Sequence, residues 1–302
     1  MNLTRRTVLG MAGSVPLALW AGCRVRLAPG RRIPIAVQLY SVRRDCAQNF
    51  DAALQQVAAM GFVGVEFAGY YGYANKAAAL AARLKALNLK VAGTHLRMPD
   101  LRGDALKATI DFHKTIGCRF LLVPGDAAFT DPEKSKALAD EFNKLAQTLK
   151  PLGMACGFHN HTGEFKKDGD KTYWDLFAER TTKDVILQQD CGWTLAAGFD
   201  PVAYVRKYPG RTRTAHFKPT VVPAGATAAR AAGAAAGAAH TAGAPKRAIL
   251  GQDSVDWKGV YAACREVGGT EWIVVEQETY PDNKPPMDCT RESLAGLLAL
   301  LK

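Results

Sequence analysis

Side chains that can bind a metal ion or move a proton follow several short apolar runs of this chain. They are His159, His161 and Glu164 in the stretch GFHNHTGEF, and Asp190, His216 and Glu276 further along. Carboxylates crowded in one cleft repel each other unless a proton or a cation separates them. A mixed set of imidazole and carboxylate groups suits Mn²⁺, Zn²⁺, Co²⁺ or Fe²⁺. The sequence therefore predicts a divalent metal site, provided that the fold brings these runs together.

Short β-rich runs alternate with segments of helical spacing from Ile33 onward. We expect strands at residues 35–40, 62–67, 90–96, 120–123, 154–159, 185–190, 212–218 and 272–276. We expect helices at residues 50–60, 74–87, 105–116, 132–149, 173–181, 201–207, 257–267 and 291–301. This order predicts an α/β fold, a single-domain (β/α)₈ TIM barrel over residues 33–302, since such barrels need about 250 residues. An open doubly wound sheet is the alternative, but no G-x-G-x-x-G follows the first strand.

Polar side chains end seven of the eight expected strands. They are Gln38, Tyr40, Glu66, His95, His159, Asn160, His161, Asp190, His216, Lys218, Glu276, Gln277 and Glu278. Because the active sites of (β/α)₈ barrels form at the carboxyl ends of the strands, we expect these side chains to share one rim.

The chain resembles the sugar phosphate isomerase/epimerase family of xylose-isomerase-like TIM barrels, which includes ketose 3-epimerases and inosose dehydratase. The resemblance covers nearly all of residues 33–302. Its motifs are QLYSVR at 38–43, GVEF at 64–67, GFHNH at 157–161, QDCGW at 189–193, HFK at 216–218 and VEQ at 275–277. It implies a divalent ion, Mn²⁺ foremost with Zn²⁺, Co²⁺, Mg²⁺ or Fe²⁺ as alternatives, held by His159, Asp190, His216 and Glu276.

Two positions depart from the family pattern. Many members have Glu where His159 stands, so either His159 binds the ion and Glu164 moves the proton, or the two exchange roles. The acid that follows His-x-Lys in many members is replaced by Pro219. An acid that could orient Lys218 is therefore missing from the motif.

The resemblance also implies roles for the other rim residues and for the reaction. We expect Glu164 and Glu66 as proton shuttles and His95 and Lys218 as groups that bind or polarise the substrate. Expected substrate contacts are Gln38, Tyr40, Asn160, His161, Trp193 and Gln277. A divalent ion on a ketone and its neighbouring hydroxyl acidifies the C–H between them. We expect a metal-dependent isomerase, epimerase or lyase acting on a keto-sugar, a polyol or a 3-keto-glycoside.

Two other classes of protein are possible on the same barrel. A non-catalytic carbohydrate-binding barrel would need no metal. An endonuclease IV-like DNA repair enzyme would suit the net charge of +11, but that family has a histidine where Trp193 stands. The lysines and arginines are scattered along the sequence rather than bunched, which favours a solvated surface and no nucleic acid partner.

The first residues are typical of a twin-arginine export signal. Arg5 and Arg6 precede a weakly apolar stretch at 10–20, too short to span a bilayer, which needs about 20 apolar residues. We expect residues 1–22 to be removed and the protein to be exported to the periplasm. The Ala-Gly-Cys that ends at Cys23 leaves attachment of a lipid anchor open. Such an anchor is the one membrane contact we expect.

Two further features of the sequence concern its packing. Residues 223–245 are almost all Ala and Gly, which predicts an insertion after the seventh strand, as a tolerated expansion or a lid. The seven cysteines have irregular spacing and no C-x-x-C pair, which indicates neither a zinc knuckle nor a disulfide framework. We expect most of these thiols to be buried core residues.

Overall fold

Eight parallel strands close into a barrel in the computed structural model, which describes residues 32–222 and 248–302. The strands are β1 Ile35–Gln38, β2 Gly64–Phe67, β3 Lys90–His95, β4 Phe120–Val123, β5 Ala155–His159, β8 Ile186–Asp190, β9 Thr214–Phe217 and β10 Trp272–Val275. The barrel closes because Val37 of β1 pairs with Val65 on one side and with Val275 on the other. The predicted (β/α)₈ fold is confirmed, and the open doubly wound sheet is wrong.

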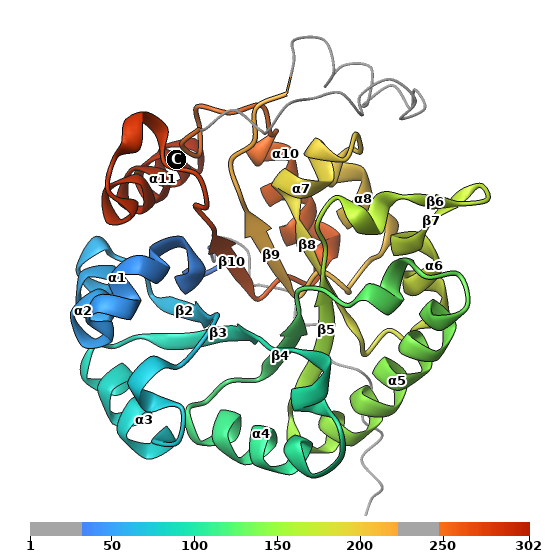
Figure 1. The fold of residues 1–302 in the computed structure, drawn as a ribbon. Coiled ribbons are helices and arrows are strands. Elements are labelled where there is room, and N and C mark those ends of the chain that lie inside the picture. The colour runs from blue at the N-terminus through green and yellow to red at the C-terminus, as the bar shows by residue number, and fades with distance from the viewer. Residues whose placement is uncertain (1–31, 223–247) are drawn as a thin grey trace, which may run out of the picture.

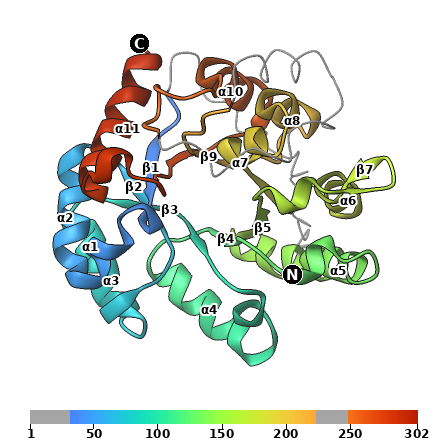
Figure 2. The ribbon, with the colours of Figure 1, turned by 45° about the horizontal axis from the view of Figure 1, so that its top comes forward.

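Helices surround the barrel, as Figure 1 and Figure 2 show. They include α2 Phe50–Met60, α3 Ala77–Ala86, α4 Gly103–Thr115, α5 Lys134–Leu149, α6 Tyr173–Arg180, α8 Pro201–Lys207, α10 Trp257–Ala263 and α11 Pro286–Leu300. Each corresponds to a predicted helix. The cap predicted before α8 forms, because the Asp200 side chain accepts a hydrogen bond from the Val202 amide at 2.8 Å.

Some short elements escape the sequence analysis. They are α1 Arg43–Gln48, α7 Cys191–Ala196 and the hairpin of β6 Lys167–Asp168 with β7 Lys171–Thr172. A helix of six residues has too few turns to show an amphipathic pattern, so composition alone does not reveal it. Of these elements α7 matters most, because it begins directly after Asp190.

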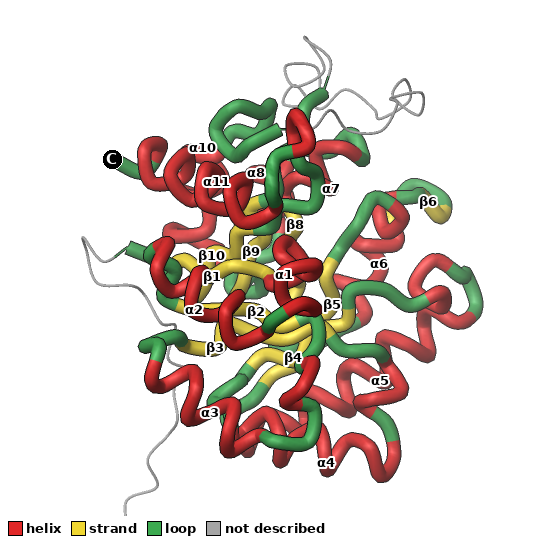
Figure 3. The backbone as a smooth tube through the Cα atoms, turned by 60° about the vertical axis from the view of Figure 1, so that its left-hand side comes forward, coloured by secondary structure: helices red, strands yellow, loops and turns green. Residues whose placement is uncertain are grey.

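The interior of the barrel is apolar at one end and polar at the other. Phe120, Leu122, Ala155 and Ile186 form a buried cluster with Trp272 packed against it, near the ends where the strands begin. Figure 3 shows the strands enclosed by the outer helices. We call the end where the strands begin and the helices finish the base face, and the opposite end the mouth. The apolar cluster fills the barrel above the base face.

Close packing in the barrel explains one glycine of the GFHNH motif. A Cβ atom added to Gly157 of β5 would overlap the backbone carbonyl of Ile186 in β8. A larger residue would push the two strands apart, at the point where both deliver side chains to the mouth.

Several predicted features lie outside the described residues. These are the export signal at residues 1–22, the possible lipid site at Cys23 and the insertion at residues 223–245. The remaining six cysteines are free and buried, as predicted. Within the described ranges, the helices are too short or too polar to cross a bilayer.

Candidate metal centre

Four buried side chains from successive strands meet at the mouth. His159 ends β5, Asp190 ends β8, His216 lies on β9 and Glu276 follows β10. One potential ligand atom from each lies within 4.8 Å of those of the other three. No member is more than 4% exposed. The structure thus brings together the four residues that the sequence analysis proposed as ligands.

Asp190 carries a buried oxygen that has nothing to bond to in the described structure. Its Oδ1 accepts a hydrogen bond from the Trp193 amide at 2.7 Å and caps α7. Its Oδ2 has no hydrogen-bond partner and lies 4.0 Å from Nε2 of His159 and 3.9 Å from Nδ1 of His216. Burial raises the pKa of Asp190 to about 7. Because an unpaired buried carboxylate oxygen is unfavourable, the donor set fits a divalent cation.

Glu66 of β2 lies beneath the cluster and is fully hydrogen bonded. Its Oε2 accepts from Gln38 at 2.9 Å and from Nε2 of His216 at 2.5 Å, and its Oε1 accepts from Gln188 at 2.8 Å. Gly93 of β3 provides the space for this carboxylate, because a Cβ atom at position 93 would lie 2.8 Å from Oε1 of Glu66. Burial alone would raise the pKa of Glu66, but His216 and His95 lower it well below its ordinary value.

The contact with Glu66 fixes the orientation of His216. With Nε2–H donating to Glu66, the other ring nitrogen, Nδ1, faces Oε2 of Glu276 at 3.1 Å. Burial alone would lower the pKa of His216, but the two carboxylates raise it to about 10. In the absence of an ion, the carboxylates of Glu66 and Glu276 therefore favour the protonated ring of His216. A divalent cation would replace the proton on Nδ1.

His159 is oriented by an amide rather than by a carboxylate. Its Nδ1 lies 2.9 Å from Oε1 of Gln188, and because an amide oxygen only accepts, this nitrogen carries the proton. Its Nε2 lone pair then faces Oδ2 of Asp190. Burial lowers the pKa of His159 well below its ordinary value, so the ring is neutral, as a metal ligand must be.

A cavity of about 600 Å³ opens from this cluster at the mouth. Its wall contains Tyr40, Ala68, Gly69, Tyr70, His95, Leu96, Arg97, Asp100, Pro124, Gly125, His159, His161, Glu276 and Glu278. Most of these residues follow β1 to β4, whereas the four clustered side chains come from β5 to β10. The two halves of the barrel thus contribute different parts of the site.

Lys218 has an acidic partner that its own motif lacks. Its ammonium group pairs with Glu278 and lies 3.5 Å from Oε2 of Glu276. It also lies 4.8 Å from the centre of the Trp193 ring. Burial alone would lower the pKa of Lys218, but the surrounding carboxylates raise it, so the group is charged. The expectation of a missing acid is corrected, because the loop after β10 provides one.

The other predicted site residues fall into two groups. Tyr40, His95 and His161 line the cavity. The side chains of the second group are fully buried and hydrogen bonded within the protein. Gln38 donates to Glu66, and Asn160 bonds to the backbone of Asp190. Gln277 donates to the carbonyls of Ala248 and Thr279. Their amides hold other parts of the mouth in place.

Glu164 is separate from both the four-residue cluster and the cavity wall. Its carboxylate accepts a hydrogen bond from the His161 amide at 2.7 Å, within its own turn. Burial raises its pKa. Of the two alternatives for the fifth strand, the geometry brings His159, and not Glu164, beside Asp190 and His216.

Three groups at the mouth were not predicted from the sequence: Gln188, Tyr70 and Arg97. Gln188 lies two residues before Asp190, and since side chains in a strand alternate, this spacing could have revealed it. Tyr70 reaches the wall from the loop after β2, where its hydroxyl lies 2.7 Å from both Thr94 and Nε2 of His113. Arg97 comes from the loop after β3. Tyr70 and Arg97 lie in loops, which have no periodic pattern, so no signal in the sequence indicates them.

Comparisons with known proteins agree with this architecture. A family model described as "Xylose isomerase-like TIM barrel" matches residues 54–300. Inosose dehydratase of Geobacillus thermodenitrificans is 25% identical over 263 residues, which make up 80% of this chain and 86% of that protein.

Two solved structures share the fold. A sugar phosphate isomerase/epimerase from Parabacteroides distasonis has a TM-score of 0.68 at 19% identity, covering 89% of this chain and 96% of that chain. The IOLI protein, solved with a binding zinc atom, has a TM-score of 0.63 at 13% identity, covering 89% and 98%. At these identities the likeness concerns the fold alone.

Proposed function

Because the chain belongs to the xylose isomerase-like TIM barrel family, we propose that it is a divalent-metal-dependent isomerase, epimerase or lyase of sugars. The substrate is a keto-sugar, a polyol or a 3-keto-glycoside. The observation that carries this proposal is the unpartnered Oδ2 of Asp190, buried among His159, His216 and Glu276. Buried charges in proteins are paired or coordinate metals.

The four clustered residues would hold the ion, and Mn²⁺ remains the first choice. The zinc atom in the IOLI structure supports Zn²⁺ as the main alternative. When bound, a divalent ion supplies polarisation of a ketone and its neighbouring hydroxyl, which acidifies the C–H between them. The side chains of the cavity would bind the substrate and transfer the proton.

His95 is best placed to take the proton. Its Nε2 lies 2.9 Å from Oε1 of Gln188 and 3.1 Å from Oε2 of Glu66, both of which only accept, so Nε2 carries the hydrogen. Nδ1 is then the basic atom of a ring that lines the cavity. A carboxylate behind a histidine holds the tautomer that a general base needs. Glu66, predicted as a shuttle, would act through His95 rather than on the substrate, and Glu164 remains the second candidate for the base.

The fate of the proton decides the product. Return to the other face of the same carbon gives epimerisation, return to the neighbouring carbon gives isomerisation, and loss of a neighbouring substituent gives elimination. The relative named inosose dehydratase supports elimination, and the structure named sugar phosphate isomerase/epimerase supports proton return. An exported protein would meet free sugars or 3-keto-glycosides rather than sugar phosphates.

Metal analysis followed by incubation with keto-sugars in D₂O tests the proposal. We expect one divalent ion per chain and deuterium in the recovered sugar or a dehydrated product. His95→Asn should keep the ion and lose the exchange, whereas Glu164→Gln should keep both. A protein without metal and without exchange would contradict the proposal and favour a carbohydrate-binding barrel.

A further inference from the structure

Positive charge gathers on the base face, at the opposite end from the metal centre. Six exposed cations lie there, in the last turns of helices, just after a helix, or at the starts of strands: Lys85, Lys90, Lys114, Lys183, Arg265 and Lys302. Within the described residues none of them has an ion-pair partner. They are scattered along the sequence, and the barrel topology collects them at one end.

The acids of the base face do not balance these cations, because each is already paired with another base. The pairs are Glu179 with Lys171, Asp184 with Lys150, Glu266 with Arg206 and Glu271 with Arg213. Cations in the last turn of a helix also favour the helix dipole. That effect does not extend to Lys90 and Lys183, which stand at or before strands. The base face therefore carries uncompensated positive charge.

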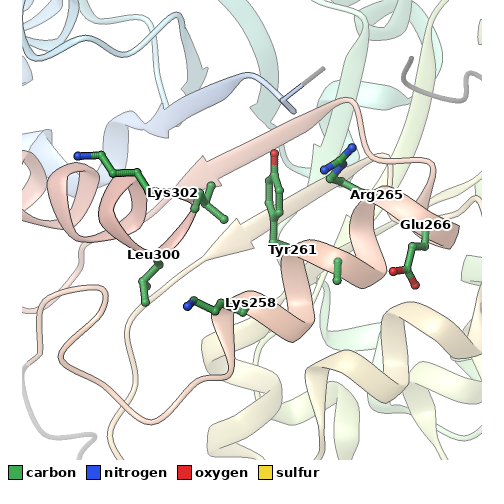
Figure 4. A pocket seen from close by; sticks show the side chains of 8 residues that line it. Lys258, Tyr261, Arg265, Glu266, Leu300 and Lys302 are labelled. Atoms are coloured by element: carbon green, nitrogen blue, oxygen red, sulfur yellow. The ribbon is translucent and has the colours of Figure 1, made fainter. Parts of the chain in front are cut away.

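Apolar side chains are exposed among these charges. Val63, just before β2, is 45% exposed, and Leu152, just before β5, is 40% exposed. A groove of about 630 Å³ between α10 and the end of α11 adds Tyr261, Leu300 and Leu301 to this surface. Figure 4 shows Lys258, Arg265 and Lys302 around this groove with Tyr261 and Leu300, and the acid that also lines it, Glu266, is paired with Arg206. Cations around an apolar floor match the headgroup and upper acyl chain of an anionic phospholipid.

The chain also enters the barrel at this face. The amide of Ile33 donates a hydrogen bond to the hydroxyl of Tyr261 in the groove at 3.2 Å. An anchor on Cys23, nine residues before Arg32, could stand at most about 30 Å from this point. Anchorage would therefore turn the base face toward the membrane and leave the mouth facing away.

We propose that the base face binds the surface of a membrane containing anionic phospholipid, and that the substrate reaches the mouth from the opposite side. Nucleic acid is the other polyanion that such a surface could attract. Exposed apolar side chains favour the membrane, because a phosphodiester backbone gains nothing from Val63, Leu152 or the groove floor. The proposal does not depend on the reaction at the mouth.

Sedimentation with vesicles tests it, using the full chain with Cys23→Ser so that no lipid is attached. One set of vesicles is phosphatidylcholine alone and the other contains an equal amount of phosphatidylglycerol. We expect binding to the anionic vesicles to be at least about tenfold tighter and to be lost at high salt. Equal binding to both sets overturns the proposal, whether or not any variant folds.

A charge-reversed variant locates the surface. The triple variant Lys90→Glu, Lys183→Glu, Lys302→Glu should weaken anionic binding at least about tenfold. Its matched control, with the same change in net charge at the mouth end, is Lys76→Glu, Lys136→Glu, Lys167→Glu, which should bind nearly as the parent does. Equal losses in the two variants overturn the proposal. Comparable binding of duplex DNA, weakened in the same way by the base variant, also overturns it.

Discussion

The two ends of the barrel are built from the same strands, yet charged side chains are buried and clustered at the mouth and exposed at the base face. At the mouth, Asp190 and His216 are fully buried, and their charges are arranged around one point. At the base face, Lys90 and Lys183 are exposed and make no ion pair within the described residues, and the neighbouring Asp184 is paired with Lys150. Between the two ends lies the apolar cluster around Ile186 and Trp272.

The residues expected to act in function and the residues expected to stabilise the fold therefore lie at opposite ends of the barrel. Burying charges is unfavourable for folding unless a partner compensates them, so the proposed cation would stabilise the mouth. The apolar layer above the base face supplies stability without taking part in the chemistry. Changes at the mouth should therefore alter metal binding first, and changes at the base should alter folding or surface binding first.

Asp190→Asn should have the largest effect on activity. The amide keeps the cap on α7, since its oxygen can still accept from the Trp193 amide, but it removes the charge that faces His159 and His216. We expect bound metal to be lost and turnover to fall at least about 100-fold, as measured by metal analysis and by exchange in D₂O. The matched control is Asp184→Asn, an exposed acid of the base face paired with Lys150. An Asp190→Asn protein that retained both metal and turnover would refute the ligand assignment.

Glu66→Gln should come next, with metal affinity about 10- to 100-fold weaker. Glutamine offers one acceptor oxygen where glutamate offers two, so either Nε2 of His216 or the Gln188 amide faces an NH₂ group, and the negative charge that supports the Nδ1 tautomer of His216 is gone. Metal titration followed by calorimetry measures this change. Asp175→Asn, a buried acid bonded to Tyr208 on the outside of the barrel, controls for destabilisation alone. If Glu66 instead shuttles protons directly, affinity will be unchanged and only the exchange rate will fall.

Ile186→Val should lower the stability of the fold without changing the metal centre at the mouth. Removing one buried methylene from the apolar cluster should lower the free energy of unfolding by about 1 kcal/mol, measured by urea denaturation. Metal affinity and turnover should stay at the parent values. Val63→Ala, at an exposed site of the same face, should leave stability nearly unchanged. A loss of metal in Ile186→Val would show that the two ends are coupled and that the base does not act on stability alone.

Glu164→Gln should have the smallest effect. It should change the free energy of unfolding slightly, by an amount that depends on pH. Burial raises the pKa of Glu164, so the folded protein binds this proton more tightly than the unfolded chain does. Stability from this group is present below its unfolded pKa and is lost as the pH rises through its folded pKa. The glutamine variant should be slightly more stable than the parent at neutral pH and no more stable in acid. Urea midpoints at both pH values measure this, and an unchanged difference would contradict it.

Periodic features of the fold could be predicted from the sequence, and features set by single contacts could not. All eight strands were predicted because each apolar run is bounded by turn residues, and parallel topology then placed their ends on one rim. The four proposed ligands meet for that reason. The role of Glu66 was not predictable, since it depends on the space left by Gly93 on the neighbouring strand. Lys218 and Glu278 were both expected on the rim, but their ion pair was not predictable, because which rim residues pair depends on the direction of each side chain.

The cap on α7 has a consequence for how an ion would bind. One oxygen of Asp190 is fixed to the backbone of the helix that follows, so the side chain has already lost its torsional freedom when folding ends. His159 and His216 are likewise held by Gln188 and Glu66. Ordering side chains consumes conformational entropy, about 0.5 to 1.5 kcal/mol for each flexible group immobilised on binding. Here that loss occurs during folding, so the proposed cation would meet a rigid site and keep more of its binding free energy.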